Sequence, residues 1–182
     1  SKICIDRPYC GLDAKVNWGW RAAMDEARAS TLVFEPVEIF TGEGCVILRS
    51  RFGSRLLRGE IAWTVYGNGA VMCALDGQVG ENLRLPRLGV EFTLPGNMSK
   101  AAYTGFGPIE NYSDRMLSAR FGSYTADVDA LGYDFAPPSE NGGREGTVQL
   151  ELSGEEPSVS FTAAKPFHFD AHHCTVDDLK AA

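Results

Sequence analysis

Short runs of apolar residues, bounded by polar and turn-forming residues, dominate the chain, and they predict β-strands. The run T-V-Q-L-E-L at 147–152 alternates cleanly, and β-branched and aromatic residues fill the other candidate runs. Asn68 between two glycines marks a hairpin turn, because glycine and asparagine accept the backbone geometry of a tight turn. Pro36 predicts a sheet edge or a bulge, since proline cannot donate a ladder hydrogen bond. We expect strands at 31–40, 45–52, 60–66, 70–76, 88–94, 147–152 and 158–162.

Few segments carry helix signals. We expect a short helix at 18–28, a turn of helix that starts near Ser113, and a helix after Thr175, whose hydroxyl can cap the following amides. The spacing of strands and turns favours an all-β, antiparallel sandwich over alternating strand–helix–strand units. Neither an internal repeat nor a low-complexity linker divides the sequence. We therefore expect a single domain over residues 1–182.

Composition narrows the class of partner. The chain has 182 residues, of which 44% are hydrophobic and 23% charged, values normal for a globular domain with a real core. Its net charge is −7 and its isoelectric point is about 5.0, so it repels phosphate backbones and nucleic acid is not an expected partner. The sequence contains no apolar run of the roughly 18 residues that a membrane helix needs. We expect the chain to be a piece of a longer protein.

The five cysteines show irregular spacing and no C-x-x-C pair, which argues against a zinc knuckle or a redox dithiol. Cys4, Cys45 and Cys73 lie among apolar residues and are expected to act as small hydrophobes. Reduced thiols favour a cytoplasmic location, with a periplasmic parent protein as the alternative.

Two runs carry the candidate chemistry: G-F-G-P-I-E-N-Y-S-D-R at 105–115 and P-P-S-E-N-G-G-R-E-G at 137–146. Such runs form polar, multi-turn loops. Their carboxylates, amides, arginines and tyrosine can contact a sugar. Alternatively, they form hydrogen bonds with the backbone of the loops themselves, which then pack against another domain. The tryptophan pair around Gly19 can stack on a sugar ring or pack in a core or at a domain interface. The candidate residues are Glu110, Asn111, Tyr112, Asp114, Arg115, Glu140, Asn141, Arg144, Trp18 and Trp20.

We expect neither a catalytic residue nor a metal site in this chain. Glu110 and Glu140 would need to lie about 5 to 5.5 Å apart to act as the acid and nucleophile of a retaining glycosidase. Zinc accepts His and Cys ligands, and His168, His172, His173 and Cys174 lie close together in the sequence. The adjacent His172 and His173 cannot easily both bind one ion, however, and no second cluster supplies the missing ligand.

The two runs belong to an ordered set of motifs. L-P-R-L-G at 85–89 precedes the first run, A-R-F-G-S-Y at 119–124 follows it, and P-F-H-F-D-A at 166–171 follows the second. This order and spacing resemble the C-terminal, small-chain domain of bacterial family 2 β-galactosidases. The resemblance covers residues 85–171 and is loose over D-R-P-Y-C-G-L-D at 6–13. It implies a galactose-mutarotase-like super-sandwich. Strands of that family continue beyond the position of Ala182, so the resemblance implies either that this chain is truncated there or that it diverges from the family at that point.

The resemblance also implies a role. In that family the catalytic glutamates lie in motifs on a preceding barrel, and those motifs are not in this sequence. The implied function is a noncatalytic domain that supports the barrel and the active-site wall, and that is inactive alone. The implied partners are the catalytic barrel, β-galactosides and further copies of the parent, with Mg or Na ions held outside this domain. A carbohydrate-binding module is one alternative. The other is an aldose-epimerase-like enzyme with His168 and Glu140 as its acid–base pair.

Overall fold

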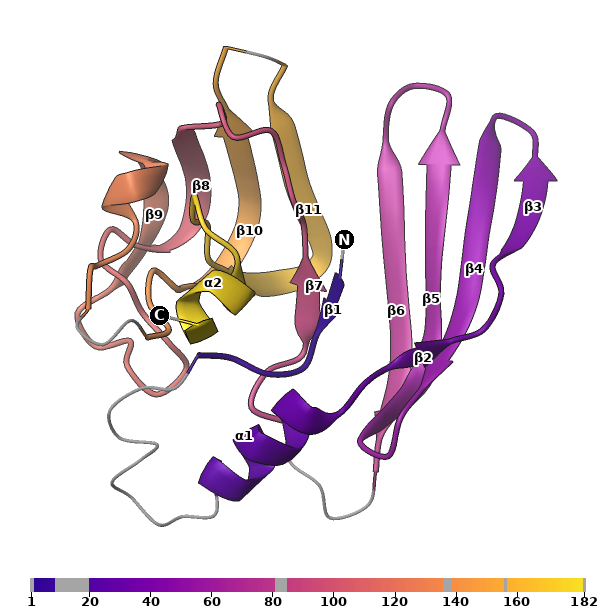
Figure 1. Ribbon diagram of the computed structural model, residues 1–182. Coiled ribbons are helices and arrows are strands. Elements are labelled where there is room, and N and C mark those ends of the chain that lie inside the picture. The colour runs from indigo at the N-terminus through magenta and orange to yellow at the C-terminus, as the bar shows by residue number, and fades with distance from the viewer. Residues whose placement is uncertain (1, 9–19, 81–84, 136–138, 156, 182) are drawn as a thin grey trace. The chain divides into compact units, whose positions relative to one another are not determined.

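Strands account for most of the structure, a computed structural model that describes residues 2–8, 20–80, 85–135, 139–155 and 157–181 (Figure 1). The elements are β1 (Lys2–Cys4), α1 (Trp20–Ala29), β2 (Val33–Phe34), β3 (Glu38–Gly42), β4 (Cys45–Gly53), β5 (Leu57–Tyr66), β6 (Val71–Val79), β7 (Gly89–Glu91), β8 (Lys100–Gly107), β9 (Arg120–Asp127), the 3₁₀ turn η1 (Val128–Ala130), β10 (Arg144–Ser153), β11 (Val159–Phe169) and α2 (Val176–Ala181). The pairings in the two larger sheets are antiparallel, which confirms the predicted all-β sandwich class.

The chain divides into two compact units. The N-terminal unit consists of Lys2–Arg7 and Asp13–Val90, and the C-terminal unit consists mainly of Glu91–Ala182. The expectation of a single domain over 1–182 stays a prediction. Each unit has its own sheet and its own hydrophobic core.

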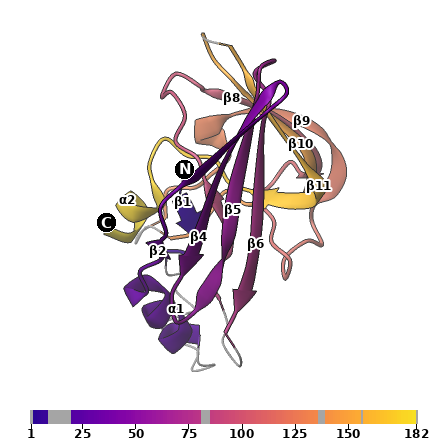
Figure 2. The ribbon, with the colours of Figure 1, turned by 90° about the vertical axis from the view of Figure 1, so that its right-hand side faces the viewer.

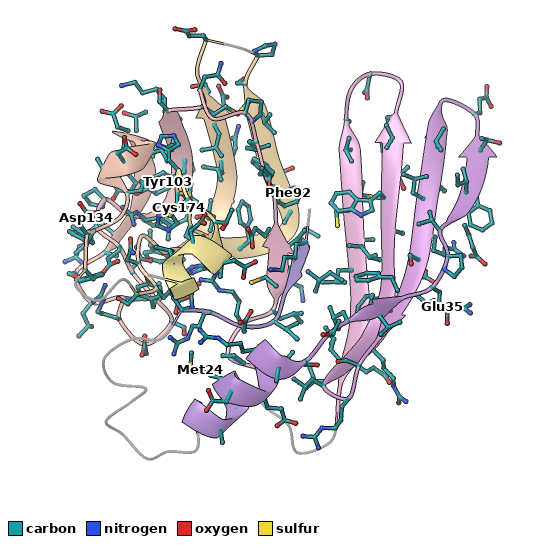
Figure 3. The ribbon with its side chains drawn as sticks, in the orientation of Figure 1. Met24, Glu35, Phe92, Tyr103, Asp134 and Cys174 are labelled. Carbon is teal, nitrogen blue, oxygen red and sulfur yellow. The ribbon has the colours of Figure 1, made fainter. Side chains whose placement is uncertain are left out.

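In the N-terminal unit, β2 and β3 both pair with β4, and β4, β5 and β6 follow side by side (Figure 2). Period-two alternation places Leu57 and Ile61 of β5 on one face, where both are buried. The same core takes in Ala27 of α1, and Met24, three residues earlier, is also buried (Figure 3). The predicted hairpin at 67–69 joins β5 to β6, and Gly69 adopts a φ of 88°.

In the C-terminal unit, the sheet order is β11–β10–β8–β9. Tyr103 at the centre of β8 lies opposite Leu150 of β10 and Tyr124 of β9, and this row packs in the core. Phe169 of β11 contacts the Tyr103 ring edge-on, with ring centroids 5.3 Å apart. Figure 3 labels Tyr103 among the side chains of this sheet. The core therefore lies on one face of this sheet.

Several boundaries differ from the sequence-based expectations. The expected strand at 31–40 is two short strands, β2 and β3, because the ladder with β4 is irregular around Pro36, where one extra residue separates the two registers. The expected strand at 88–94 is only the three residues of β7. The turn of helix expected near Ser113 is wrong: Tyr112 and Arg115 exchange backbone hydrogen bonds in a tight turn. Strands β8 and β9 were not expected.

The helix expected after Thr175 is confirmed as α2. The Thr175 hydroxyl accepts a hydrogen bond from the Asp178 amide at 3.1 Å, and the Asp178 carboxylate accepts one from the Thr175 amide at 2.8 Å. This reciprocal pair is a capping box. It lowers the pKa of Asp178, because hydrogen bonds from Thr175 stabilise the carboxylate.

None of the cysteines that the structure describes forms a disulfide: Cys4, Cys45, Cys73 and Cys174. Cys4 is buried as expected, whereas Cys45 and Cys73 are half-buried and Cys174 is exposed. Burial raises the pKa of the Cys73 thiol. Within the described ranges, no helix combines the length and apolar character needed to cross a bilayer.

Candidate functional site

The two candidate loops lie at one end of the C-terminal sheet. Strand β8 leads into the first loop after Gly107, and β10 begins with Arg144 at the end of the second. Because β8 and β10 are antiparallel neighbours, the end of one lies beside the start of the other. The sheet register thus brings together residues more than 30 positions apart in the sequence.

Asn111 lies at the centre of the loop cluster and has 0% of its surface exposed. Its side-chain amide donates to the carbonyl oxygens of Phe106 and Ile109, at 3.0 and 2.9 Å. Its side-chain oxygen accepts from the amide of Glu145, and its own backbone amide donates to the carbonyl of Gly143, each at 2.9 Å. One asparagine therefore holds the first loop closed and joins it to the second.

Glu110 is buried, and its two carboxylate oxygens have separate partners. One oxygen pairs with the guanidinium of Arg115, whose side chain is largely exposed. The other accepts the backbone amide of Gly142 at 2.9 Å. Glu110 raises the pKa of Arg115 through this hydrogen bond, because the carboxylate stabilises the charged guanidinium. The carboxylate thus serves as a second link between the loops.

Tyr112 contacts the second loop and β11. Its hydroxyl accepts the amide of Gly143 at 3.3 Å, and its ring lies 5.7 Å from the ring of His168. The guanidinium of Arg115 lies 5.4 Å from the Tyr112 ring centroid. Burial raises the pKa of Tyr112 above its ordinary value, and the charge of Glu110 adds to that effect. Nδ1 of His168 in turn lies 3.2 Å from the carboxylate of Glu145.

Arg144 is buried at the first position of β10, with 3% of its surface exposed. Its Nε donates to the hydroxyl of Tyr103 at 3.0 Å. Nη1 donates to the carbonyls of Gly142 and Gly143 at 3.0 and 3.1 Å, and Nη2 to that of Leu131 at 3.3 Å. A buried cation needs such hydrogen bonds to offset its lost hydration. Arg144 therefore fixes the backbone of the second loop on the core.

Asn141 is the second buried asparagine of the cluster. Its side-chain oxygen accepts the amide of Tyr133 at 3.0 Å, and its amide donates to the carbonyl of Ser139 at 2.8 Å. Its backbone carbonyl lies 3.2 Å from Nε2 of His172. Gly142 follows with a φ of 77°, a left-handed conformation that glycine adopts without strain.

Four further candidates were predicted: Asp114, Glu140, Trp18 and Trp20. Asp114 is exposed at the tip of the first loop, and Glu140 is half-buried. Trp18 lies outside the described residues. Trp20 begins α1, and the structure does not describe its side chain.

The histidine–cysteine segment contacts the loop cluster through His168 and His172 and a different carboxylate through His173. Nδ1 of His173 lies 2.7 Å from the carboxylate of Asp129. Among the described residues, no group of three or more His, Cys, Asp or Glu side chains has a geometry that could hold a metal ion.

The structure thus brings together six of the predicted residues: Glu110, Asn111, Tyr112, Arg115, Asn141 and Arg144. Sequence reasoning missed Tyr103 and did not single out Glu145, although Glu145 lies within the second run. It also considered His168 with Glu140, whereas the carboxylate beside His168 Nδ1 is that of Glu145. The register of β10 and β11 decides that pairing, and no local sequence signal reports it.

Fold and site together define an all-β structural domain, in which buried carboxylate, amide and guanidinium groups connect two loops to each other and to a hydrophobic core. The chain belongs to the β-galactosidase small chain family, whose model matches residues 4–182.

The chain is similar to β-galactosidases from several bacteria. It is 35% identical to that of Vibrio cholerae serotype O1 over 135 residues, which are 72% of this chain and 12% of the relative. It is 31% identical to the Oenococcus oeni protein over 57% of this chain and 10% of the relative. For the Photobacterium profundum protein, identity is 32% over 54% of this chain and 10% of the relative. The chain therefore matches about a tenth of the length of these curated relatives.

Proposed function

We propose that this chain is a noncatalytic domain of a β-galactosidase, which supports the catalytic barrel and shapes one wall of its active site. The observation that carries this proposal is the internal bonding of the two loops. Asn111 is fully enclosed, and both oxygens of Glu110 have partners within the loop cluster. A hydrolytic acid or nucleophile needs a carboxyl group that can reach a substrate. A cluster bonded in this way suits a rigid surface.

The remaining properties of the parent enzyme follow from the same proposal. Its substrates are terminal β-D-galactosides, and its Mg or Na ions lie outside this domain. It works in the cytoplasm. The parent assembles as a homo-oligomer, with this domain in contact with the barrel.

Nitrophenyl-galactoside cleavage tests the proposal directly. The full parent protein is expected to cleave this substrate, whereas the 182-residue chain alone is expected to give no turnover above buffer. Turnover by the purified chain alone would contradict a noncatalytic role. Calorimetry with galactose and lactose separates the alternative of an independent binding module. Saturable binding by the isolated chain at sub-millimolar sugar would favour that module, and the absence of heat favours the supporting role.

A further inference from the structure

The connection between β8 and β9 exposes large apolar side chains beside the bonded loop cluster. Leu117 is 98% exposed, Phe121 is 56% exposed and Ile109 is 41% exposed. Phe121 packs edge-on against Phe106 across the β8–β9 pair, with centroids 5.6 Å apart. A single exposed leucine needs no explanation, whereas a patch of exposed apolar side chains marks an interaction surface. Residues 109–121 contribute three such large apolar side chains.

The backbone that carries Leu117 is held in place. The amide of Ala119 donates to the carbonyl of Met116 at 3.0 Å, which closes a turn with Leu117 and Ser118 at its tip. Nη1 of Arg120 donates to the carbonyls of Leu117 and Ala119, at 3.1 and 3.0 Å. Such a preformed turn loses little conformational freedom when a partner covers it.

The composition of the surface indicates the chemistry of its partner. Aromatic residues and arginine are enriched at protein interfaces, and lysine is depleted. Here Arg115 and Arg120, both exposed, lie on either side of Leu117 in the sequence, and Phe121 follows. The complementary surface is an apolar depression for Leu117 with carboxylates at its rim for the two guanidinium groups.

We propose that residues 109–121 form the surface through which this domain docks on the rest of its parent β-galactosidase, with Leu117 as the anchor. This inference rests on the proposed function. About nine-tenths of the length of the relatives lies outside the match, so a large polypeptide partner belongs to the same protein. The surface adjoins the loop cluster that the proposed function assigns to barrel support, because Glu110 and Arg115 lie within 109–121.

Amide hydrogen exchange tests the docking surface. Amides of residues 116–121 are expected to exchange at least tenfold more slowly in the full-length parent than in the 182-residue chain. Equal rates at 116–121, with protection elsewhere in the same chain, would overturn the proposal. If the parent fails to cleave nitrophenyl-galactoside, the proposed function fails, and the exchange comparison still decides whether 109–121 is a docking surface.

A pair of variants in the parent provides a second test. Leu117→Asp is expected to speed thermal inactivation of the parent several-fold and to raise exchange at 116–121. Ser118→Asp, which introduces the same charge at the neighbouring exposed position of the turn, should do neither. In the isolated chain, Leu117→Asp should leave the unfolding midpoint unchanged, because the side chain is 98% exposed. Inactivation of Leu117→Asp at the wild-type rate would also refute the assignment.

Discussion

The guanidinium of Arg144 donates from Nε to the phenol oxygen of Tyr103 at 3.0 Å, and this bond joins the polar loop cluster to the hydrophobic core. The Tyr103 ring packs against Phe169 and Tyr124, while its hydroxyl reaches the first residue of β10. A tyrosine suits this position because it presents an apolar ring and a polar tip. The geometry of the loops therefore depends on core packing as well as on their own hydrogen bonds.

Tyr103→Phe should lower the free energy of unfolding by about 2 kcal/mol, because Nε of a buried, charged donor loses its acceptor. Tyr124→Phe is the matched control. Its hydroxyl donates to the carbonyl of Arg120 at 2.8 Å in an exposed setting, so the loss should stay below about 1 kcal/mol. Urea denaturation of both variants measures the difference. Equal losses would show that Arg144 does not depend on Tyr103.

Asn111→Ala should cost about 3 kcal/mol of stability, because it removes three part-buried hydrogen bonds, those to the amide of Glu145 and to the carbonyls of Phe106 and Ile109. Asn68→Ala removes a single bond to the amide of Ala70 in an exposed turn and should change stability by about 0.5 kcal/mol or less. Chemical denaturation again gives both values. A loss for Asn111→Ala as small as that for Asn68→Ala would refute the central role of Asn111.

The raised pKa of Tyr112 predicts a loss of stability at alkaline pH. Burial keeps its phenol neutral in the folded protein, whereas an unfolded tyrosine ionises near pH 10. The neutral phenol therefore contributes its full stability below about pH 10, and that contribution is lost as pH rises toward the folded-state pKa. Urea denaturation at pH 8 and pH 11 should show a larger decrease for the wild type than for Tyr112→Phe. Equal decreases would mean that Tyr112 ionises equally in both states.

Gly59→Ala should destabilise the N-terminal unit by roughly 1–3 kcal/mol. Gly59 of β5 pairs with Gly77 of β6, and an added Cβ would overlap the Asp76 backbone oxygen and lie 2.7 Å from the Gly77 Cα. Gly53→Ala in β4 is the control, since a Cβ there meets nothing within 4 Å, and its effect should stay within about 0.5 kcal/mol. Thermal unfolding followed by circular dichroism measures both. A neutral Gly59→Ala would mean that β5 and β6 can separate without cost.

Strands with a strong side-chain signal could be predicted from the sequence. β4, β5 and β6 contain β-branched or aromatic residues, β10 alternates cleanly over 147–152, and each of the four was expected. β8 and β9 were missed because Gly105, Gly107 and Gly122, with several alanines, weaken the strand signal. Glycine is required at Gly105, since a Cβ there would lie 2.9 Å from the Cα of Thr147. The glycines that allow β8 and β10 to approach closely therefore also lower the strand propensity of the sequence.

The site could be predicted only in part. Glycine, proline and acidic residues correctly marked both loops, and the type of contact expected of Glu110 and Asn111 follows from their side-chain chemistry. Which groups they meet depends on the sheet register, which places Gly142, Gly143 and Glu145 beside the first loop. The position of Pro166 within a strand also depends on the register. β11 continues past this proline, because an irregularity between Thr147 and Gln149 of β10 interrupts the ladder of hydrogen bonds there.

Pro36 gives the N-terminal sheet a built-in protection against polymerisation. Residues 35–37 separate β2 from β3, so two short edge strands pair with β4 in place of one long edge strand. A strand from another molecule could pair with this edge only over two short stretches. The nitrogen of Pro36 has no hydrogen to donate, so a continuous ladder cannot form. Replacing that imino acid by valine would restore a continuous template, and fibre formation measured by thioflavin fluorescence should rise accordingly.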